Sequence, residues 1–344
     1  MKRLLMGLSI AWLASGSGVD MTAQPLTSTS ATSWTASTPG PNRWDPSWTF
    51  LPATCRGLAF GGIYSDGYHS ETLLFDPVFG SWEQLTFQLS KRPSNRAGAG
   101  LSYDSVRSRA VLFGGHNGAG ALRDTWTFDP VVKKWTKAIG NCKANVCPPA
   151  RTLQGQVFST VLGKTVVFGG LGGTRLQVSL NDVWVFDGTW SQVSTTNAPP
   201  ARSRFGMAED ATNGKIVVFG GLGSGDVVLS DTWILDPATL TWTQVPAGPT
   251  PAGKFLLAMS YAPSLGGVVA HSGADAAENQ TNETWAFDFA GSTWVSIATS
   301  PPPPLRTDAR LAADTCNGQA VLFGSPDARN PPPTPQINYT WILQ

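Results

Sequence analysis

Charge is scarce in this chain, and so are histidine and long apolar segments. Charged residues make up 14% of its 344 residues, and the net charge is +1. Such a balance gives no bulk attraction to nucleic acid or to an anionic membrane surface, so we expect neither as a partner. The apolar stretch at residues 4–13 is too short to span a bilayer, and no later stretch approaches that length. We therefore expect no membrane span in the mature chain.

The sequence also lacks the motifs of several large enzyme classes. It contains no G-x-S-x-G nucleophile turn, no Walker phosphate loop and no H-E-x-x-H zinc motif. Its four cysteines do not form the paired C-x-x-C arrangement of a zinc site. These absences favour a binding role over an enzymatic one, and we expect no cofactor and no bound metal.

The N-terminus has the features of a secretory signal peptide. Lys2 and Arg3 form a positive head, residues 4–13 are apolar, and small residues follow at 14–16. We assign residues 1–20 to the signal peptide, residues 21–32 to a Ser/Thr-rich linker and residues 33–344 to the folded part. An uncleaved anchor or a disordered tail is the alternative. The signal peptide predicts a secreted or periplasmic protein, in which disulfides can form.

Glycine (37), proline (26) and tryptophan (14) are frequent, and they recur in a regular pattern. Six times a basic residue stands 18 positions ahead of the small residue that ends an apolar run, and the small residues recur every 51 to 55 positions. A period of this length indicates one supersecondary unit copied into an array. The six pairs are Arg43/Gly61, Arg96/Gly114, Arg151/Gly169, Arg202/Gly220, Lys254/Ser272 and Arg306/Gly324.

Each repeat is predicted to form four antiparallel strands. In residues 96–138, a Gly/Ala-rich strand is followed by an apolar strand, by a strand that alternates polar and aromatic residues, and by a fourth strand at Trp135. The sixth repeat has no fourth strand of its own, so we expect the strand around Trp34 to complete it and close a ring. A competing alignment uses residues 48–51 instead, but it would leave the first repeat without an inner strand. We therefore predict an all-β, six-bladed propeller closed by an N-terminal strand.

Ring closure would make the first and last repeats neighbours. Cys55 and Cys316 occupy equivalent turns of these two repeats, so we predict a disulfide between them. Cys142 and Cys147 stand in one short loop, and we predict a second, local disulfide there.

These features resemble the kelch repeat, in which a double glycine after an apolar strand is followed by an acidic residue and by two spaced tryptophans. The resemblance covers residues 33–344, with mild departures at Ser272-Gly273, Gly324-Ser325 and Leu73. It implies a six-bladed wheel of the galactose oxidase/kelch type. It does not specify a function, because kelch wheels serve as partner-binding modules, carbohydrate-active enzymes and cytoskeletal linkers.

In such a wheel the basic residues would stand where the innermost strands begin, around one mouth of the channel. Converging cationic groups attract carboxylates and sulfates through charge-assisted hydrogen bonds. We therefore predict a monomeric binding module for an anionic or carbohydrate ligand at this mouth, the partner being an acidic peptide, a protein or an anionic glycan. The predicted ligand-binding residues are Arg43, Arg96, Arg151, Arg202, Arg204, Lys254 and Arg306.

A purely structural propeller is one alternative. An acid stands at the start of the third strand in five repeats, where it would pair with the basic residue. The sixth repeat has Tyr339 at that position, which leaves Arg306 with less compensation. The five acids are Glu71, Asp124, Asp182, Asp231 and Glu283.

An enzyme similar to the sialic acid mutarotases is the other alternative. Glu209 and Asp308 on inner strands are then the candidate catalytic acids, acting near a cation such as Arg204. The histidines (His69, His116 and His271) are predicted on one face but in different blades, which argues against a shared metal. Tyr68-His69 is similar to two adjacent copper ligands of galactose oxidase, but the remaining ligands have no counterpart, so we do not expect copper chemistry.

Overall fold

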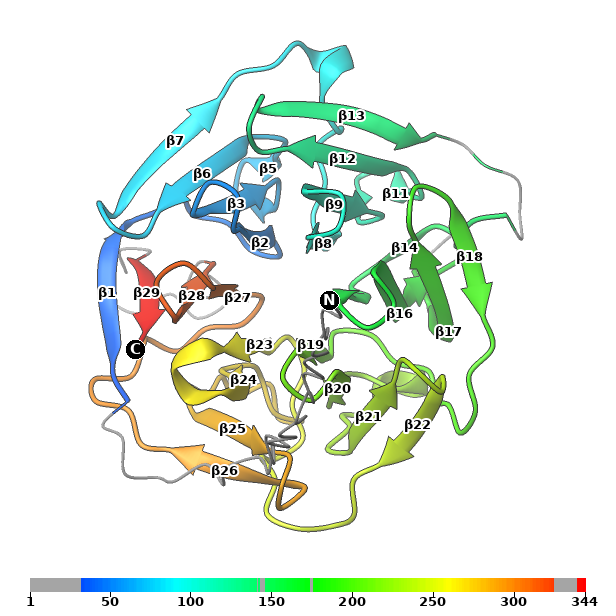
Figure 1. The fold of residues 1–344 in the computed structure, drawn as a ribbon, viewed down its shortest axis with the longest axis vertical. Coiled ribbons are helices and arrows are strands. Elements are labelled where there is room, and N and C mark those ends of the chain that lie inside the picture. Colours follow the sequence, from blue (N-terminus) through cyan, green and yellow to red (C-terminus); the bar gives the residue numbers. More distant parts are fainter. Residues whose placement is uncertain (1–31, 141, 143–145, 174–175, 325–338) are drawn as a thin grey trace, which may run out of the picture.

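Six antiparallel sheets stand around a central axis as the blades of a six-bladed propeller (Figure 1). The structure is a computed structural model that describes residues 32–140, 142, 146–173, 176–324 and 339–344. The predicted signal peptide and all but the last residue of the predicted linker lie outside the described residues, so export stays a prediction. In the described part of the chain, no helix has the length and the apolar composition that crossing a membrane requires.

In blades 1 to 5 the strands follow each other in sequence order from the channel to the rim. Blade 1 contains β2 (Ser47–Leu51), β3 (Arg56–Phe60), β6 (Thr72–Asp76) and β7 (Ser81–Leu85). Blade 2 contains β8 (Gly100–Asp104), β9 (Arg109–Phe113), β12 (Thr125–Asp129) and β13 (Lys134–Ile139). Blade 3 contains β15 (Gly155–Ser159), β16 (Lys164–Gly172), β17 (Val178–Phe186) and β18 (Trp190–Val193), with a short β14 (Arg151–Thr152) that also pairs with β16.

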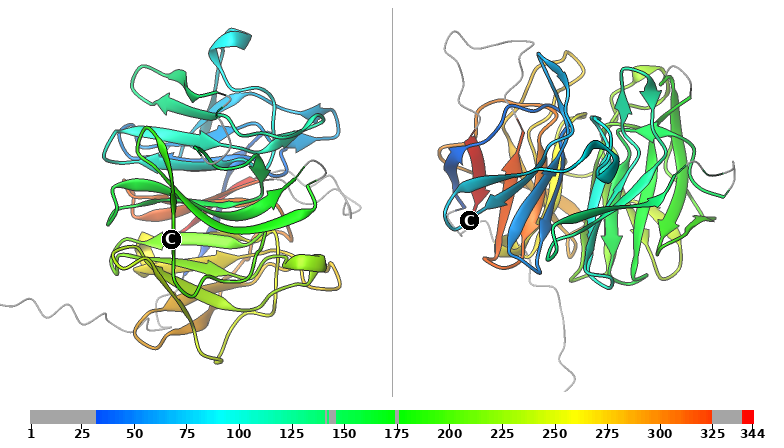
Figure 2. Two further views of the ribbon diagram at one scale, coloured as in Figure 1. Left: turned by 90° about the vertical axis from the view of Figure 1, so that its right-hand side faces the viewer. Right: turned by 90° about the horizontal axis from the view of Figure 1, so that it is seen from above.

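Blades 4 and 5 are regular. Blade 4 contains β19 (Gly206–Asp210), β20 (Lys215–Phe219), β21 (Thr232–Asp236) and β22 (Thr241–Gln244). Blade 5 contains β23 (Ala258–Ala262), β24 (Gly267–His271), β25 (Thr284–Asp288) and β26 (Thr293–Ile297). Figure 2 shows the propeller from the side, with the sheets of neighbouring blades side by side.

Blade 6 is closed by the N-terminal strand. Its inner strands are β27 (Arg310–Asp314), β28 (Gln319–Phe323) and β29 (Tyr339–Leu343), and β1 (Trp34–Pro39) completes the sheet. Trp34 lies opposite Leu343 in this pairing, and the blue β1 runs along the red β29 in Figure 1. Trp48 belongs to β2, the inner strand of blade 1. Closure through Trp34 is therefore confirmed, and the competing alignment is wrong.

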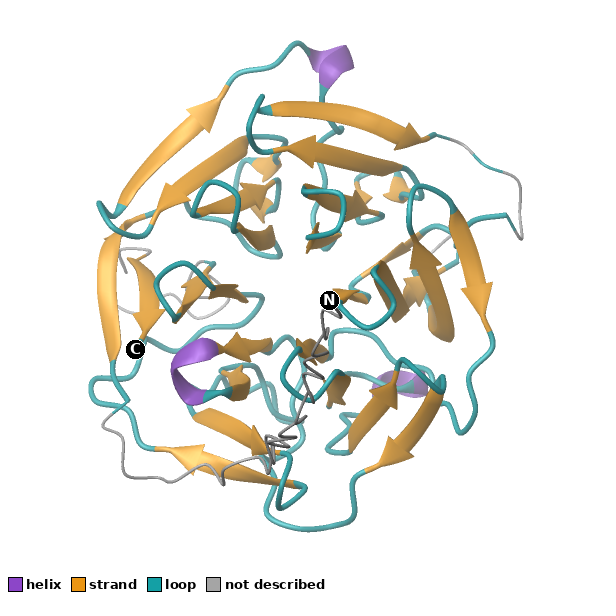
Figure 3. Cartoon of the chain, in the orientation of Figure 1, coloured by secondary structure: helices purple, strands orange, loops and turns teal. Residues whose placement is uncertain are grey.

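Some connections between strands contain short hairpins or 3₁₀ helices (Figure 3). The hairpins β4 (Ile63–Tyr64) with β5 (Gly67–Tyr68) and β10 (His116–Asn117) with β11 (Gly120–Ala121) connect the second and third strands of blades 1 and 2. The 3₁₀ helices are η1 (Leu89–Lys91), η2 (Ser224–Asp226) and η3 (Pro263–Leu265). We call the side of the propeller on which the inner strands begin the ring face, because the six basic residues precede these strands.

The two disulfides of the structure have the pairings predicted from the sequence. Cys55 and Cys316, whose Cα atoms are 5.8 Å apart, join the β2–β3 turn to the β27–β28 turn. This bond links blades 1 and 6 on the face opposite the ring face. Cys142 and Cys147, with Cα atoms 6.3 Å apart, close a short loop after β13.

Each second strand is apolar because its two faces pack against neighbouring blades. In β9, Val111, Leu112 and Phe113 are at most 1% exposed. Gly114 follows with a φ of 71°, in the left-handed region that favours glycine. A Cβ atom at this position would lie 2.6 Å from the carbonyl oxygen of Arg151, so the glycine allows the next blade to approach closely.

In four of the six blades, a tryptophan of the outermost strand bonds to the preceding blade. Nε1 of Trp135 in blade 2 donates a hydrogen bond of 2.9 Å to Oγ1 of Thr72 in blade 1. Trp242 of blade 4 is an exception, because Val183 stands in blade 3 at the position that corresponds to Thr72. The buried Nε1 of Trp242 has no acceptor within the described chain. The same bond recurs from Trp190 to Thr125, from Trp294 to Thr232 and from Trp34 to Thr284.

Candidate functional site

Arg96 shows how the basic residues of the repeats are held. Its side chain is 0% exposed. Nη1 donates to Asp124 Oδ1 at 2.7 Å and to the carbonyl oxygen of Gly114 at 3.0 Å, and Nη2 donates to Asp124 Oδ2 at 3.0 Å. Both partners belong to blade 2. The guanidinium therefore forms a bidentate ion pair inside its own blade.

Four further basic residues also bind the acid of their own blade. The nitrogen-to-oxygen distances are 3.4 Å for Arg43–Glu71, 2.6 Å for Arg151–Asp182, 2.7 Å for Arg202–Asp231 and 2.5 Å for Lys254–Glu283. Burial raises the carboxyl pKa of Asp124, Asp182 and Asp231, but the hydrogen bonds and the charge of the arginine outweigh burial. The pKa of each of these three groups is therefore below its ordinary value, and they stay ionised.

The backbone of the same residues bonds to the preceding blade. The carbonyl oxygen of Arg96 accepts a hydrogen bond of 2.8 Å from the N–H of Gly62, and that of Arg151 accepts one of 2.9 Å from Gly115. Equivalent bonds run from Gly170 to Arg202, from Gly221 to Lys254 and from Gly273 to Arg306. These basic residues therefore link two blades, as the structural alternative requires. Ligand binding by the side chains of the basic ring stays a prediction. Burial of these side chains does not favour it.

Arg306 differs from the other members of the ring. It is 0% exposed, and it donates from Nε to the carbonyl oxygen of Pro304 and from Nη1 to that of Gly324. Nη2 has no acceptor among the residues described. Burial lowers the pKa of this guanidinium to about 10. Among the described residues, Arg306 therefore has no acidic partner of the kind that Arg96 has in Asp124.

A second ring of residues, each two positions after a basic residue, encircles the axis. Each member has a left-handed backbone, with φ between 48° and 62°. In each member from Gly98 to Asp308, the backbone N–H donates to the carbonyl oxygen of the member in the preceding blade, at 2.8 to 3.2 Å. We call these residues the inner ring: Asp45, Gly98, Leu153, Arg204, Leu256 and Asp308.

A cavity of about 1050 Å³ lies at the ring face, next to the inner ring. We call it the mouth cavity. Its walls come from Trp44 and Ile63 of blade 1, from residues 222–226 and 228 of blade 4 and from other connections in blades 3 and 5. The charged residues that line it are four acids and one arginine, namely Asp45, Asp226, Glu278, Asp308 and Arg204.

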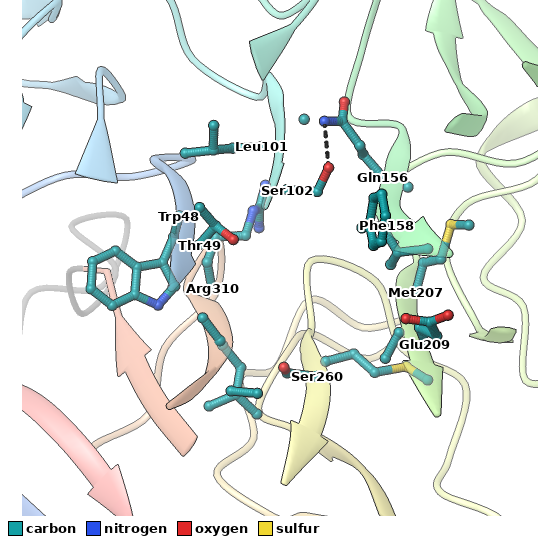
Figure 4. Close-up of a pocket in the computed structure, with 18 of the residues that line it drawn as sticks. Trp48, Thr49, Leu101, Ser102, Gln156, Phe158, Met207, Glu209, Ser260 and Arg310 are labelled. Carbon is teal, nitrogen blue, oxygen red and sulfur yellow. Dashed lines mark hydrogen bonds between the residues drawn. The ribbon is translucent and has the colours of Figure 1, made fainter. Parts of the chain in front are cut away.

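The inner strands of all six blades line a second cavity of about 370 Å³, the channel cavity (Figure 4). Figure 4 shows Glu209 and Met207 on one side of it and Arg310 on the other. Arg310 Nη2 donates to Asp45 Oδ1 at 2.7 Å, so this cation is already paired. Arg204 lines both cavities and lies where they meet.

Glu209 is the titratable group of the channel cavity with the most altered pKa. Burial raises the pKa of its carboxyl to about 7, against the effect of hydrogen bonds from the N–H and the hydroxyl of Thr160. Glu209 stands near the end of β19, away from the ring face, whereas Asp308 belongs to the mouth cavity. The structure therefore does not bring the two candidate catalytic acids together.

The three histidines each have local partners. His69 Nε2 lies 2.9 Å from Asp66 Oδ1, and His116 Nδ1 lies 2.9 Å from Thr152 Oγ1. His271 is buried and its ring packs on Trp34 at a centroid distance of 4.8 Å. In the described part of the chain, no group of three or more His, Cys, Asp or Glu side chains is arranged to hold a metal ion.

Sequence reasoning missed most residues of the inner ring and the loop acids of the mouth cavity. The signal that could have found the inner ring is positional, because its members stand two residues after the six basic residues. Their chemistry differs from blade to blade, so a search for a repeated residue type passes over them. Aligning the repeats and examining the variable columns would have identified them.

Known proteins show the same repeats. The model of the KLHDC2/KLHL20/DRC7 Kelch-repeats domain matches residues 56–264. The chain is 30% identical over 265 residues to Adagio protein 3 of Arabidopsis thaliana, covering 71% of this chain and 40% of that protein. It is 32% identical over 192 residues to Adagio-like protein 1 of Oryza sativa subsp. japonica, covering 52% of this chain and 28% of that protein.

A mammalian protein is also similar. The chain is 28% identical over 151 residues to Kelch domain-containing protein 1 of Mus musculus, covering 42% of this chain and 33% of that protein. The matches span less than half the length of each of these three relatives. Together with the six recurring blades and the closed ring, the domain match shows that this chain belongs to the kelch-repeat family.

Proposed function

We propose that this protein is an exported interaction module that binds a segment of a partner protein in the mouth cavity. The observation that carries the proposal is the cavity itself, which measures about 1050 Å³ and lies at the axis of the ring face between connecting segments of several blades. Loops held by a rigid scaffold are common recognition elements. A cavity of this size can admit several side chains of a bound peptide. Membership of the kelch-repeat family supports a protein as the partner.

The charges of the mouth cavity favour a basic partner segment. Asp226 and Glu278 are exposed, and neither carboxylate has an ion-pair partner within the described residues. Asp45 is already neutralised by Arg310. An acidic peptide, the ligand expected from the basic ring alone, would meet these carboxylates instead of the buried arginines. We therefore propose that the bound segment presents lysine or arginine to Asp226 and Glu278.

Peptide selection tests this proposal. A random peptide library is selected against the wild-type protein, and the recovered peptides are measured against a variant that combines Asp226→Asn and Glu278→Gln. We expect peptides rich in lysine and arginine, with affinity that decreases as salt is added. Exposed ion pairs contribute about 0.2–1 kcal/mol each, so loss of two weakens binding roughly 2- to 30-fold.

Glu83→Gln is the matched control. Glu83 is an exposed acid on β7 at the rim, where it pairs with Lys133, so its loss leaves peptide affinity unchanged. Recovered peptides that bind the double variant as tightly as the wild type, or that are acidic, would contradict the proposed site.

Turnover of a small sugar in the channel cavity is a second candidate function. Glu209 supports it, because a carboxyl with a pKa of about 7 in a cavity of about 370 Å³ can exchange a proton near neutral pH. Asp308 lines the other cavity, so Glu209 would act without it. The test is NMR exchange between the anomers of sialic acid with wild-type protein and with Glu209→Gln. Acceleration that disappears in the variant supports catalysis, and no acceleration by the wild type rules it out for this sugar.

A further inference from the structure

In blades 2, 3 and 4, one carboxylate holds an arginine and a tryptophan of the same blade. In blade 4, Asp231 Oδ1 accepts from Arg202 Nη1 at 2.7 Å, and Oδ2 accepts from Arg202 Nη2 at 2.8 Å and from Trp233 Nε1 at 2.6 Å. The corresponding tryptophan bonds are 2.7 Å from Trp126 to Asp124 and 2.7 Å from Trp184 to Asp182. The carboxylate therefore receives N–H donors from two different side chains.

Blade 6 contains both donors of this arrangement, but its chain has no acid at the equivalent position. Tyr339 stands in the sequence where the other five repeats have aspartate or glutamate. Arg306 Nη2 and Trp341 Nε1 are buried, and neither has an acceptor among the described residues. Arg306 is 0% exposed and Trp341 is 8% exposed. In the described part of blade 6, the two donors that share one acceptor in blades 2, 3 and 4 thus have none.

Arg306 has the orientation of the arginines in the complete blades. Its Nε donates to the carbonyl oxygen of Pro304 at 3.2 Å, and its Nη1 donates to that of Gly324 at 3.0 Å. Arg202 makes the same two bonds in blade 4, at 3.2 and 3.1 Å. Because the guanidinium is planar and rigid, fixing Nε and Nη1 in the same way directs Nη2 to the place where a carboxylate lies in blade 4.

The backbone position of Trp341 is also equivalent. Trp341 pairs with Leu322 on β28, two residues before Gly324. Trp233 pairs with Val218 on β20, which stands two residues before the corresponding glycine. The tryptophan of blade 6 therefore starts from the same point of the sheet as the one that donates to Asp231.

We propose that Arg306 and Trp341 form a binding site for the carboxylate of a small organic acid from outside the chain. A buried guanidinium needs a counter-charge, because taking a cation out of water without one is costly. A carboxylate supplies that charge and has enough lone pairs to accept from Nη2 and from the indole N–H together. Burial of both donors favours a small acid over the side chain of a partner. This inference does not depend on the partner proposed for the mouth cavity.

Titration with acetate tests the site through the tryptophan itself. The indole N–H resonances are recorded in ¹H–¹⁵N spectra, and the Trp341 resonance is assigned with Trp341→Phe. We expect acetate, but not chloride at equal ionic strength, to move this resonance downfield in a saturable way. The Trp233 resonance serves as the internal control and stays in place, because its N–H already donates to Asp231.

Variants at two positions separate the proposed chemistry from a general salt effect. Tyr339→Asp places an acid in the chain, so the Trp341 resonance should lie downfield without acetate and should no longer respond to it. Tyr339→Glu serves the same purpose should the aspartate variant not fold. Arg306→Lys keeps the charge but loses the planar fork, and it should weaken acetate binding about tenfold.

Three results would overturn the proposal. The first is the absence of a saturable shift of Trp341 in the wild type, and the second is an equal response in Tyr339→Asp. The third concerns Asp327, which lies outside the described residues. If the wild-type resonance is already downfield and Asp327→Asn moves it upfield, the carboxylate belongs to the chain and not to an external acid.

Discussion

Replacing Asp231 by asparagine tests whether the basic ring is a structural element. Arg202 is 0% exposed, and the side chain of Asp231 is 20% exposed. Asparagine keeps the shape of the side chain, but it removes the negative charge and turns one acceptor oxygen into an NH₂ donor. The variant thus leaves a buried guanidinium without a counter-charge. If the NH₂ group stands at the Oδ2 position, Arg202 Nη2 and Trp233 Nε1 lose their shared acceptor. If it stands at the Oδ1 position, Arg202 Nη1 loses its acceptor instead.

The size of the effect follows from the burial of the pair. Removing one partner of a buried ion pair costs about 3–5 kcal/mol. Because Asp231 is partly exposed, water can reach the site, and we expect the lower end of this range, about 3 kcal/mol. Urea unfolding followed by tryptophan fluorescence at neutral pH measures the free energy of unfolding.

The pH dependence of this difference has a definite sign. Burial raises the pKa of Asp231, but the hydrogen bond and the charge of Arg202 lower it by more than burial raises it. The folded-state pKa of Asp231 is therefore below its ordinary value. Stability from such a group is present above the ordinary carboxyl pKa and is lost as the pH falls through the folded-state pKa. The wild type and Asp231→Asn should therefore differ by a constant amount near neutral pH, and the difference should narrow below about pH 4.

A pair in the same blade that is more exposed than Arg202 and Asp231 provides the control. Lys215 and Asp236 lie 2.7 Å apart, and their side chains are 34% and 30% exposed. Asp236→Asn should cost at most about 1 kcal/mol. If Asp231→Asn costs no more than this control, the buried pairs are not structural, and ligand binding by the basic ring becomes the better interpretation.

Further substitutions test three other parts of the structure. Val183→Thr offers Trp242 the hydroxyl acceptor that four equivalent tryptophans have, and in urea unfolding the free energy of unfolding should rise by about 0.5–1.5 kcal/mol. Thr232→Val deprives Trp294 of its acceptor, and the free energy of unfolding should fall by about 1–3 kcal/mol. Effects of the same sign in both variants would refute this account. Replacing Cys55 and Cys316 by serine should lower the free energy of unfolding by about 2–4 kcal/mol, and by more than the same change at Cys142 and Cys147, because the closed loop is longer. An equal loss in the two double variants would argue against that explanation. Glu209 has a raised pKa, so its contribution to stability is present below its ordinary pKa of 4.5 and is lost as the pH rises toward about 7. Glu209→Gln should therefore flatten the fall in stability between these values in urea titrations, and an unchanged slope would show that Glu209 is not buried as described.

The architecture could be predicted because the repeats contain the residues that build the backbone. The apolar strands, the glycines after them and the fourth-strand tryptophans recur at regular spacing, and the number of these repeats predicts the number of blades. Closure through Trp34 followed from the need of blade 1 for an inner strand, which Trp48 supplies. The disulfide between Cys55 and Cys316 followed from the same closure.

The site was harder to predict, because spacing in the sequence gives strand order but not the direction of a side chain. Arg96 stands where the sequence placed it, before the inner strand of blade 2, but its guanidinium turns into the blade toward Asp124. Glu209 and Asp308 are both associated with inner strands, yet they line different cavities near opposite ends of the channel. The residues of the inner ring, including Asp308, have a left-handed backbone that no local sequence motif indicates, except at Gly98.

Symmetry explains why the repeated residues do not mark the ligand site. A residue type that recurs in every blade, such as the basic residue of the ring, serves what every blade requires, namely packing within the blade and contact with its neighbour. A ligand on the axis lacks sixfold symmetry, so residues that recognise it must differ from blade to blade. The inner ring has this property, since its members are two aspartates, two leucines, a glycine and an arginine. The same reasoning applies to blade 6, where Arg306 is a repeated residue but Tyr339, at the position of its partner, is not. Departures from the repeat within one chain therefore indicate where recognition can arise, and the donors left over at such a departure indicate its chemistry.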